Sequence, residues 1–359
     1  MNDRAAARFR AGSDRLPRNH PGATALAAGS AAALLLAAAI LAGSRNLGNF
    51  DVALLGYAVG TVVLAFGATY RLVLWASSPA ARRYLARGWS ALLGNPAGVP
   101  RATRARRIRA AGSSVLLQPF IAERGVARWL AHQGLFWGVV SATAITFPLT
   151  FGWIHFRSVA GFDTAYWIYV AGFRTAKIDA LSIAGWLAFH GLNFSALLVL
   201  AGGGWFLLRR WRDRGEHLTQ LGRDVMPLVA LMAISVTGLL LTLSSALLAG
   251  WGYRPMAVVH MCTVVLTLVW VPFGKFFHTV QRPAMAGVQL HKEASLQAGG
   301  PAACVSCGSP VEGAVFLSDL QSTMGELGLG YAGWVRTCPA CKRLARGAAY
   351  LQTVKGGYR

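Results

Sequence analysis

Six long apolar runs constrain the fold of this chain more than any other feature of its sequence. A helix needs roughly 20 apolar residues to cross the hydrocarbon core of a bilayer. The runs that reach this length are residues 23–43, 52–76, 129–152, 184–208, 225–250 and 256–279. Only 13% of the residues are charged, against about 25% in an ordinary soluble domain. The sequence therefore predicts an all-α integral membrane helix bundle with about six transmembrane helices.

Arginines lie mainly in alternate connections between these runs. The arginine-rich segments are the tail 1–22 and the loops 77–128 and 209–224, whereas the connections 43–51, 153–183 and 250–255 hold few basic residues. The positive-inside rule places the arginine-rich segments in the cytoplasm. We therefore expect a multi-pass protein of the bacterial cytoplasmic membrane with both termini cytoplasmic. The net charge of +22 then reflects topology and contact with anionic lipids, and nucleic-acid binding is not expected.

Segments outside the bundle, which spans residues 23–279, differ in character. In the 77–128 loop, "ARRYLARGWSALLG" predicts a basic amphipathic helix at the membrane surface, and "NPAGVP" predicts a break. Segment 153–183 is external, aromatic and partly amphipathic, which suits the outer membrane face. Residues 280–303 are small and polar and predict a linker, and residues 304–359 predict a small cytoplasmic domain.

Histidines inside the apolar runs are the first candidate functional residues. Four of the eight histidines lie in predicted spans, namely His132, His190, His260 and His278. Ionisable residues inside a membrane are costly, so each is a functional hypothesis by default. His260 and His278 are 18 residues apart, which is five whole helical turns or about 27 Å. On one continuous helix, both side chains would therefore lie on the same face.

The expected topology predicts how the four histidines pair. His260 lies near the outer end of the last span, at the depth of His190, and His278 lies near the inner end, at the depth of His132. Two imidazoles from facing helices are the axial ligands expected of a b-type haem. We therefore predict an outer haem on His190 and His260 and an inner haem on His132 and His278. The alternatives to haem are isolated histidines hydrogen-bonded to neighbouring helices, or a proton path. Within the haem prediction, His155 is a possible substitute for His190.

The last span carries a resemblance to a known family. The H-x17-H pair and the exit sequence "GKFFHTVQRP" make residues 129–285 resemble the gamma subunit of respiratory nitrate reductase and related di-haem cytochrome b subunits. The resemblance implies quinol oxidation or quinone reduction coupled to a cytoplasmic redox partner subunit. That gamma subunit draws its partner histidines from one other helix, whereas here two helices supply them. It also has five spans and no cysteine domain of this kind.

Four cysteines form two closely spaced pairs near the C-terminus. "CVSCG" holds Cys304 and Cys307, and "CPACK" holds Cys338 and Cys341. Two C-x2-C knuckles can supply four thiolates to a tetrahedral site, which suits zinc or a single iron. Disulfides are not expected in the reducing cytoplasm. The knuckles resemble those of rubredoxin and of zinc ribbons. Structural zinc is favoured, whereas iron would extend an electron path. Cys262, in the last span, is expected to serve packing alone.

A quinone site should adjoin one haem and offer a group that accepts a proton. The outer candidates are His155, Asp163, Arg174, Lys177, Asp179 and Tyr253, and the inner ones are Lys275, Gln281 and Arg282. The outer side is favoured, because releasing protons there while electrons move inward conserves energy. The structural alternative for each residue is an interfacial anchor or a snorkelling charge.

Taken together, these features predict a membrane cytochrome b subunit that passes electrons between quinone and a cytoplasmic molybdenum or iron–sulfur oxidoreductase. The chain shows no nucleotide-binding glycine motif and no domain of molybdopterin-binding size, so the terminal chemistry is assigned to the partner. One alternative is a proton-coupled transporter, against which stand the lack of an internal repeat and the scarcity of carboxylates in the spans. Another is a membrane-anchored zinc-ribbon scaffold.

Overall fold

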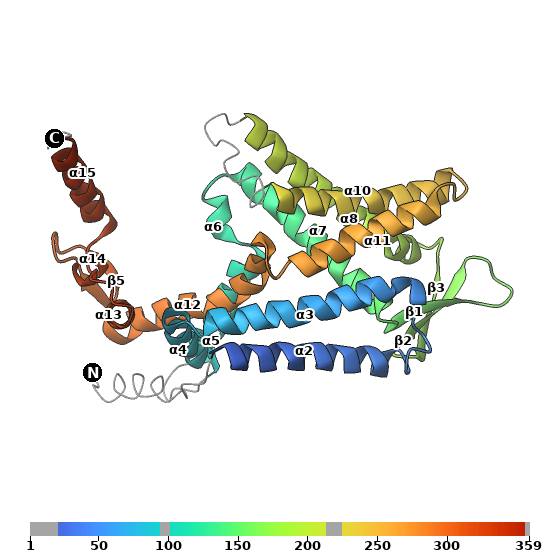
Figure 1. Ribbon diagram of the computed structural model, residues 1–359, viewed down its shortest axis with the longest axis horizontal. Coiled ribbons are helices and arrows are strands. Elements are labelled where there is room, and N and C mark those ends of the chain that lie inside the picture. Colours follow the sequence, from blue (N-terminus) through green and yellow to red (C-terminus); the bar gives the residue numbers. More distant parts are fainter. Residues whose placement is uncertain (1–20, 94–100, 213–224, 356–359) are drawn as a thin grey trace. The chain divides into compact units, whose positions relative to one another are not determined.

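The chain folds into two compact units. Figure 1 shows the chain coloured along its sequence. The structure, a computed structural model, describes residues 21–93, 101–212 and 225–355. The membrane unit comprises Gly22–Val73 and Leu117–Val280. The cysteine unit comprises Leu74–Leu116 and Gln281–Arg359, together with the N-terminal residues up to Pro21. The predicted break "NPAGVP" and most of the tail 1–22 and of the 209–224 loop lie outside the described residues.

Among the described residues, five helices are long and apolar enough to cross a membrane. They are α2 (Pro21–Gly43), α3 (Leu55–Ala76, after the 3-10 turn Val52–Leu54), α8 (Ile183–Arg212), α10 (Met226–Leu247) and α11 (Tyr253–Trp270). These helices fit a multi-pass membrane protein. The predicted span at 129–152 forms helix α7 (Val126–Thr150) but is not among the five. Its apolar sequence is interrupted near the start by Arg128, His132 and Gln133.

Helix α7 packs closely along α8 within the membrane unit. A Cβ atom at Gly138 would lie 2.8 Å from the carbonyl oxygen of Ser195, and one at Gly202 would lie 2.4 Å from that of Ala131. The hydroxyls of Ser141 and Ser195 are hydrogen-bonded across the same contact at 2.8 Å. Small residues and hydroxyls of this kind let membrane helices approach until their backbones touch. The α7–α8 pair is therefore a close helix contact even though α7 is the less apolar partner.

We expect the Gly202→Val variant to destabilise the membrane unit, because its new side chain would collide with the backbone of α7. Overpacking a close contact costs about 1–3 kcal/mol, so the thermal unfolding temperature of the purified chain should fall. Gly204→Val is the matched control, since a Cβ atom there meets nothing within 4 Å. Equal unfolding temperatures for the two variants would contradict the α7–α8 contact.

The prediction of one continuous helix over 256–279 is wrong. Helix α11 ends at Trp270, and the 3-10 turn η2 (Lys275–Phe277) leads into α12 (His278–Gly299). Pro272 explains the break, because proline lacks a backbone N–H and its ring clashes with the preceding turn. The guanidinium of Arg71, on α3, donates to the Pro272 carbonyl. His260 and His278 therefore do not share the face of one helix, and the five-turn spacing no longer supports one helix that offers a haem ligand near each end.

Segment 153–183, which was predicted to be external, contains a sheet, so the all-α prediction is incomplete. Strands β1 (Ile154–Ser158), β2 (Ala165–Val170) and β3 (Phe173–Asp179) form an antiparallel sheet in the order β1-β2-β3. Ala171 and Gly172 both have positive φ, as a tight two-residue hairpin turn requires. The rings of Phe156 and Tyr166 pack against Phe189 of α8 at 5.3 and 5.4 Å, which fixes one face of the sheet against the bundle.

The cysteine unit combines the arginine-rich connection after α3 with the C-terminal segment. The predicted amphipathic helix forms as α4 (Pro79–Leu93), and the expected linker 280–303 is largely helix α12. The other elements are α5 (Arg101–Leu116), the antiparallel pair β4 (Pro301–Ala303) and β5 (Pro310–Gly313), α13 (Ala314–Glu326), α14 (Ala332–Val335) and α15 (Pro339–Lys355). The short helix α6 (Pro119–Ala122) precedes α7 in the membrane unit. A Cβ atom at Gly88 would lie 1.6 Å from the Gly287 carbonyl oxygen, so α4 and α12 touch through their backbones.

Candidate metal centre and histidine sites

The four knuckle cysteines come together in the cysteine unit. The sulfur atoms of Cys304, Cys307, Cys338 and Cys341 all lie within 4.8 Å of one another. Cys304 and Cys338 are buried, whereas Cys307 is exposed and Cys341 half-buried. All five cysteines of the chain are free thiols, and Cys262 stands apart on α11 with an exposed side chain. The predicted sulfur quartet is thus assembled by the fold.

Backbone hydrogen bonds shape the two knuckles. The amide N–H of Cys338 donates to the Cys304 sulfur at 3.2 Å, and that of Cys341 donates to the Cys338 sulfur at 3.4 Å. In the first knuckle, the Gly308 amide donates to the Cys304 carbonyl, and Gly308 has a φ of 73°. This left-handed conformation strains residues that carry a Cβ atom, which explains the glycine in "CVSCG". The knuckles are joined where the Val305 amide donates to the Arg336 carbonyl.

Thiol ionisation in the quartet favours a bound cation. The hydrogen bond from the Cys338 amide lowers the pKa of Cys304 to about 6. The hydrogen bond between the Cys341 and Cys307 side chains raises the pKa of Cys341 to about 12. The Cys304 thiol thus ionises readily, whereas the Cys341 thiol keeps its proton because it is hydrogen-bonded to Cys307. A bound metal ion would supply the positive charge that deprotonates the full set.

Sulfur spacing agrees with a tetrahedral metal site. Zinc–sulfur bonds of 2.3 Å set the sulfur atoms of a tetrahedral site roughly 3.8 Å apart. The Cys307 and Cys338 sulfur atoms are 3.6 Å apart. The four cysteines can therefore hold a metal ion such as zinc or iron. Zinc would stabilise the fold, whereas a single iron would also carry one electron at a time.

Three of the four histidines predicted to lie in spans have Nδ1 hydrogen-bonded to a local partner. Nδ1 of His190 donates to the Trp186 carbonyl at 2.9 Å, and Nδ1 of His278 donates to the Lys275 carbonyl at 2.7 Å. Carbonyl oxygens only accept hydrogen bonds, so Nδ1 is the protonated nitrogen in both neutral rings. The lone pair is then on Nε2, the atom that a neutral imidazole presents to a metal in this tautomer.

His260 reaches the same state through a hydroxyl on another helix. Its Nδ1 lies 2.9 Å from the hydroxyl oxygen of Thr237 on α10. The Thr237 hydroxyl donates its own proton to the Ala233 carbonyl at 2.7 Å, so its oxygen accepts from His260. This contact fixes the tautomer of the His260 imidazole, and it also joins α10 to α11. Tautomer control of this kind accompanies most metal-bound histidines.

His190 and His260 lie at matched positions on their helices. Each is seven residues after the first residue of α8 or α11, which is about 10 Å along the axis. Helix α10 packs against both α8 and α11 and is bonded to each. The hydroxyl of Thr242 donates to the Asn193 side chain on α8, as Thr237 meets His260 on α11. No hydrogen bond or ring contact joins His190 to His260 in the part of the chain that the structure describes.

The inner pair is less alike in its surroundings. His132 is half-buried near the start of α7, whereas His278 is exposed at the start of α12, directly after the Pro272 break. Beside that break, the guanidinium of Arg71 lies 4.5 Å from the ring centroid of Phe277.

The histidine chemistry fits axial ligation by Nε2. The hollow of about 180 Å³ between α10 and α11, lined partly by Thr237, is smaller than the roughly 300–1,000 Å³ of ordinary ligand pockets.

Four of the six outer quinone candidates, His155, Arg174, Lys177 and Asp179, lie on one face of the sheet formed by β1, β2 and β3, with Asp179 opposite Ala165 at the end of β3. Strand pairing sets His155 opposite Tyr169, Tyr169 opposite Arg174, and Trp167 opposite Lys177, so all of these side chains share one face. The Arg174 guanidinium lies 4.6 Å from the Trp167 ring centroid. The His155 ring stacks on Tyr169 at 4.9 Å. Burial lowers the pKa of His155, and the neighbouring Arg157 guanidinium lowers it further.

The other two outer candidates lie away from this face, and Asp179 also has a contact of its own. Asp163 is exposed in the connection between β1 and β2, and Tyr253 is the first residue of α11. The Asp179 carboxylate accepts a hydrogen bond from the Leu181 amide at 2.9 Å, which gives it a structural role before α8. Of the inner candidates, Lys275 belongs to η2 and Gln281 and Arg282 belong to α12. The candidates therefore do not form a single cluster.

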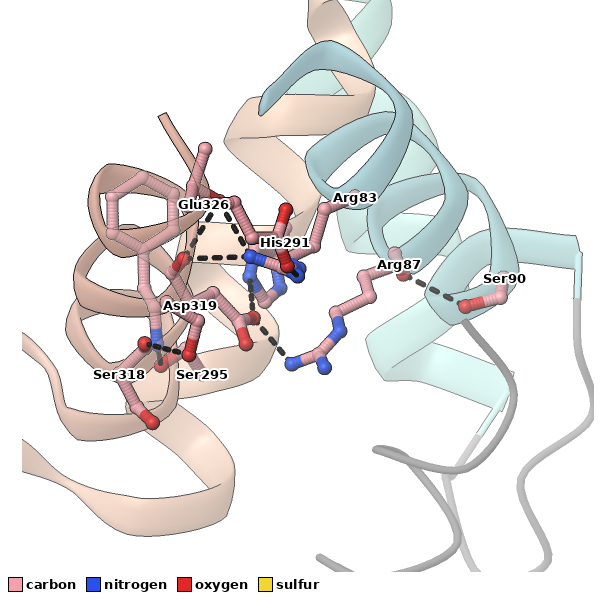
Figure 2. Close-up of polar contacts among 11 residues, drawn as sticks. Arg83, Arg87, Ser90, His291, Ser295, Ser318, Asp319 and Glu326 are labelled. Carbon is pink, nitrogen blue, oxygen red and sulfur yellow. Dashed lines mark hydrogen bonds and ion pairs between the residues drawn. The ribbon is translucent and has the colours of Figure 1, made fainter. Parts of the chain in front are cut away.

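A buried polar cluster in the cysteine unit was not predicted from the sequence (Figure 2). The Asp319 carboxylate on α13 forms an ion pair with Arg87 of α4 and accepts a hydrogen bond from Nε2 of His291 on α12 at 2.9 Å. His291 is fully buried, and Asp319 is 5% exposed. Arg83, one turn before Arg87, binds the Thr323 hydroxyl and the exposed Glu326 carboxylate. Two arginines expected at the lipid surface thus stabilise the contact among α4, α12 and α13.

Comparisons with protein-family models, with curated proteins and with solved structures found no match to this chain. The resemblance to di-haem cytochrome b subunits therefore stays a prediction.

Proposed function

We propose that this protein is a membrane cytochrome b subunit that transfers electrons between the quinone pool and a cytoplasmic molybdenum or iron–sulfur oxidoreductase. In this proposal it resides in the bacterial cytoplasmic membrane with both termini in the cytoplasm. Its ligand pairs are those of the sequence prediction, His190 with His260 and His132 with His278. When bound, haem b supplies a reversible one-electron couple. The Nδ1 contacts of His190, His260 and His278 favour this proposal over the transporter alternative.

The observation that carries this proposal is the repeated Nδ1 hydrogen bond at His190, His260 and His278. In a proton path, each imidazole would accept a proton at one nitrogen and release one from the other, so both nitrogens would need hydrogen-bond partners along the path. Here Nδ1 is occupied by a carbonyl or by Thr237, and the acceptor nitrogen is Nε2 in each ring. The matched positions of His190 and His260 on α8 and α11 support the outer pair most strongly. Support for the inner pair is weaker, because the break at Pro272 separates His278 from α11.

The remaining roles in this proposal belong to the outer sheet and the cysteine quartet. His155 can accept a proton from quinol, because its lowered pKa keeps the ring neutral at physiological pH. Arg174 and Lys177 share the face of the sheet with His155 and can attract the oxygens of a quinone. Zinc in the cysteine quartet would stabilise a surface for the partner subunit. Iron there would add a redox centre on the cytoplasmic side.

We expect His260→Ala to remove one of two haems from the purified chain, because it deletes a ligand of the outer pair alone. His190→Ala should remove the same haem, whereas the His155→Ala control should retain both. The pyridine haemochrome assay measures haem per chain for each variant. Thr237→Val should weaken haem retention by about 10–100-fold without removing a ligand, as loss of a hydrogen bond to a ligating histidine typically does. Unchanged haem content in His260→Ala would refute the outer pair.

A further inference from the structure

Helix α15, Pro339–Lys355, presents an apolar stripe that no part of the described chain covers. Leu344, Leu351 and Val354 are 74%, 55% and 58% exposed. Residues seven and three apart lie along one side of an α-helix, so these side chains form a continuous stripe. Tyr350, near its edge, is 69% exposed. Figure 1 shows α15 extending from α14 with no other helix or strand of the cysteine unit along it. Burial in the cysteine unit therefore does not explain these apolar residues.

The charges of α15 all have one sign. Its sequence contains the cations Lys342, Arg343, Arg346 and Lys355, and no acidic residue occurs from Pro339 to Lys355. Lys342 and Arg346 lie away from the apolar stripe, and Arg343 lies at its edge. An exposed helix with an apolar stripe and only cations beside it complements a surface that is anionic and has an apolar interior. An anionic lipid bilayer is such a surface.

We infer that α15 binds the surface of an anionic lipid bilayer, with Leu344, Leu351 and Val354 inserted among the lipids and its cations at the headgroups. The same chain carries five helices fit to span a membrane, so bilayer lipid accompanies the protein wherever it resides. Exposed Tyr331 and Trp334, which precede α15 in the same unit, are residue types enriched at membrane interfaces. Helix α15 begins within the second knuckle at Pro339, so binding would hold the metal centre at the bilayer surface. This inference does not depend on haem.

Hydrogen exchange of the full-length chain in nanodiscs tests this inference. In discs that contain phosphatidylglycerol, exchange of the α15 amides should be about tenfold slower than in discs of phosphatidylcholine alone, because each cation at an anionic surface favours binding several-fold. Salt near 1 M, where the Debye length is roughly 3 Å, should remove most of this difference. Nanodiscs of purified chain contain no partner protein, so protection there reports lipid alone. Equal α15 exchange in the two lipid compositions would overturn the inference.

Paired glutamine variants separate lipid binding from helix stability. Leu344→Gln with Leu351→Gln should abolish the lipid-dependent protection, whereas Ala349→Gln, on the opposite side of α15, should preserve it. Each variant is compared with itself in the two lipid compositions, so a change in helix stability alone cancels from the ratio. Arg343→Gln with Arg346→Gln should reduce the protection in phosphatidylglycerol. If Ala349→Gln abolishes the protection as fully as the double leucine variant, the stripe is not the binding face.

Discussion

Replacing Cys304 by serine should abolish metal binding by the full-length chain and loosen the C-terminal half of the cysteine unit. Cys304 is buried, its sulfur accepts the Cys338 amide, and its carbonyl and amide close the first knuckle. A structural metal site contributes its binding free energy directly to folding, so loss of a ligand loses both. Elemental analysis should give one zinc or iron per chain for the native protein and none for Cys304→Ser. Hydrogen exchange should accelerate in β4, β5 and the knuckles.

The control for this variant is Cys262→Ser. Cys262 is exposed on α11, in the membrane unit, and takes no part in the sulfur quartet. Its replacement should leave the metal content and the exchange of the cysteine unit unchanged. A chain that binds no metal before substitution, or that retains full metal content in Cys304→Ser, would show that the quartet is not a metal site.

Replacing Asp319 by asparagine should destabilise the cysteine unit by about 3–5 kcal/mol, because it removes one charge from a buried ion pair. Arg87 and Asp319 are 7% and 8% exposed at their side chains, so water cannot compensate the lost charge. His291, fully buried, would lose its carboxylate partner in the same change. The free energy of opening of α13, from hydrogen exchange of the full-length chain, measures this effect.

Glu326→Gln supplies the matched control, because it also removes an acidic charge from α13. The Arg83–Glu326 pair is more exposed, with Glu326 45% exposed, so its loss should cost no more than about 1 kcal/mol. Arg87→Met combined with Asp319→Leu should recover much of the stability lost by Asp319→Asn, since no unpaired ion is left inside. A cost for Asp319→Asn no larger than that for Glu326→Gln would contradict the buried role of Asp319.

The cysteine knuckles, the apolar helices and helix α4 could be predicted from the sequence, because each is determined by residues that are close together in the chain. The cysteine knuckles are set by residues three apart and by the glycine that follows the first pair, so their spacing alone indicated a four-sulfur site. The apolar runs likewise indicated the spanning helices, because helix length and apolar composition are local properties. Helix α4 was also predicted from its own pattern of arginines and apolar residues.

Other features depend on contacts or on single residues inside an otherwise uniform pattern. Pro272 lies within an apolar run, so hydropathy remains high at the point where the helix ends. The Pro272 carbonyl accepts a hydrogen bond from Arg71, which belongs to another helix. The external sheet was missed because its aromatic residues were interpreted as an interfacial belt, although "AYWIYV" is rich in strand-forming residues. Pairing of Arg87 with Asp319 joins residues far apart in the chain, and no local pattern indicates it.

The central claim is that this chain is a di-haem cytochrome b, and an optical measurement tests it most directly. The full-length protein should be purified in detergent from cells that supply haem, and its reduced-minus-oxidised spectrum recorded with a pyridine haemochrome assay on the same sample. We expect b-type bands and two haems per chain. A colourless preparation, with the cysteine unit folded and its metal present, would contradict it.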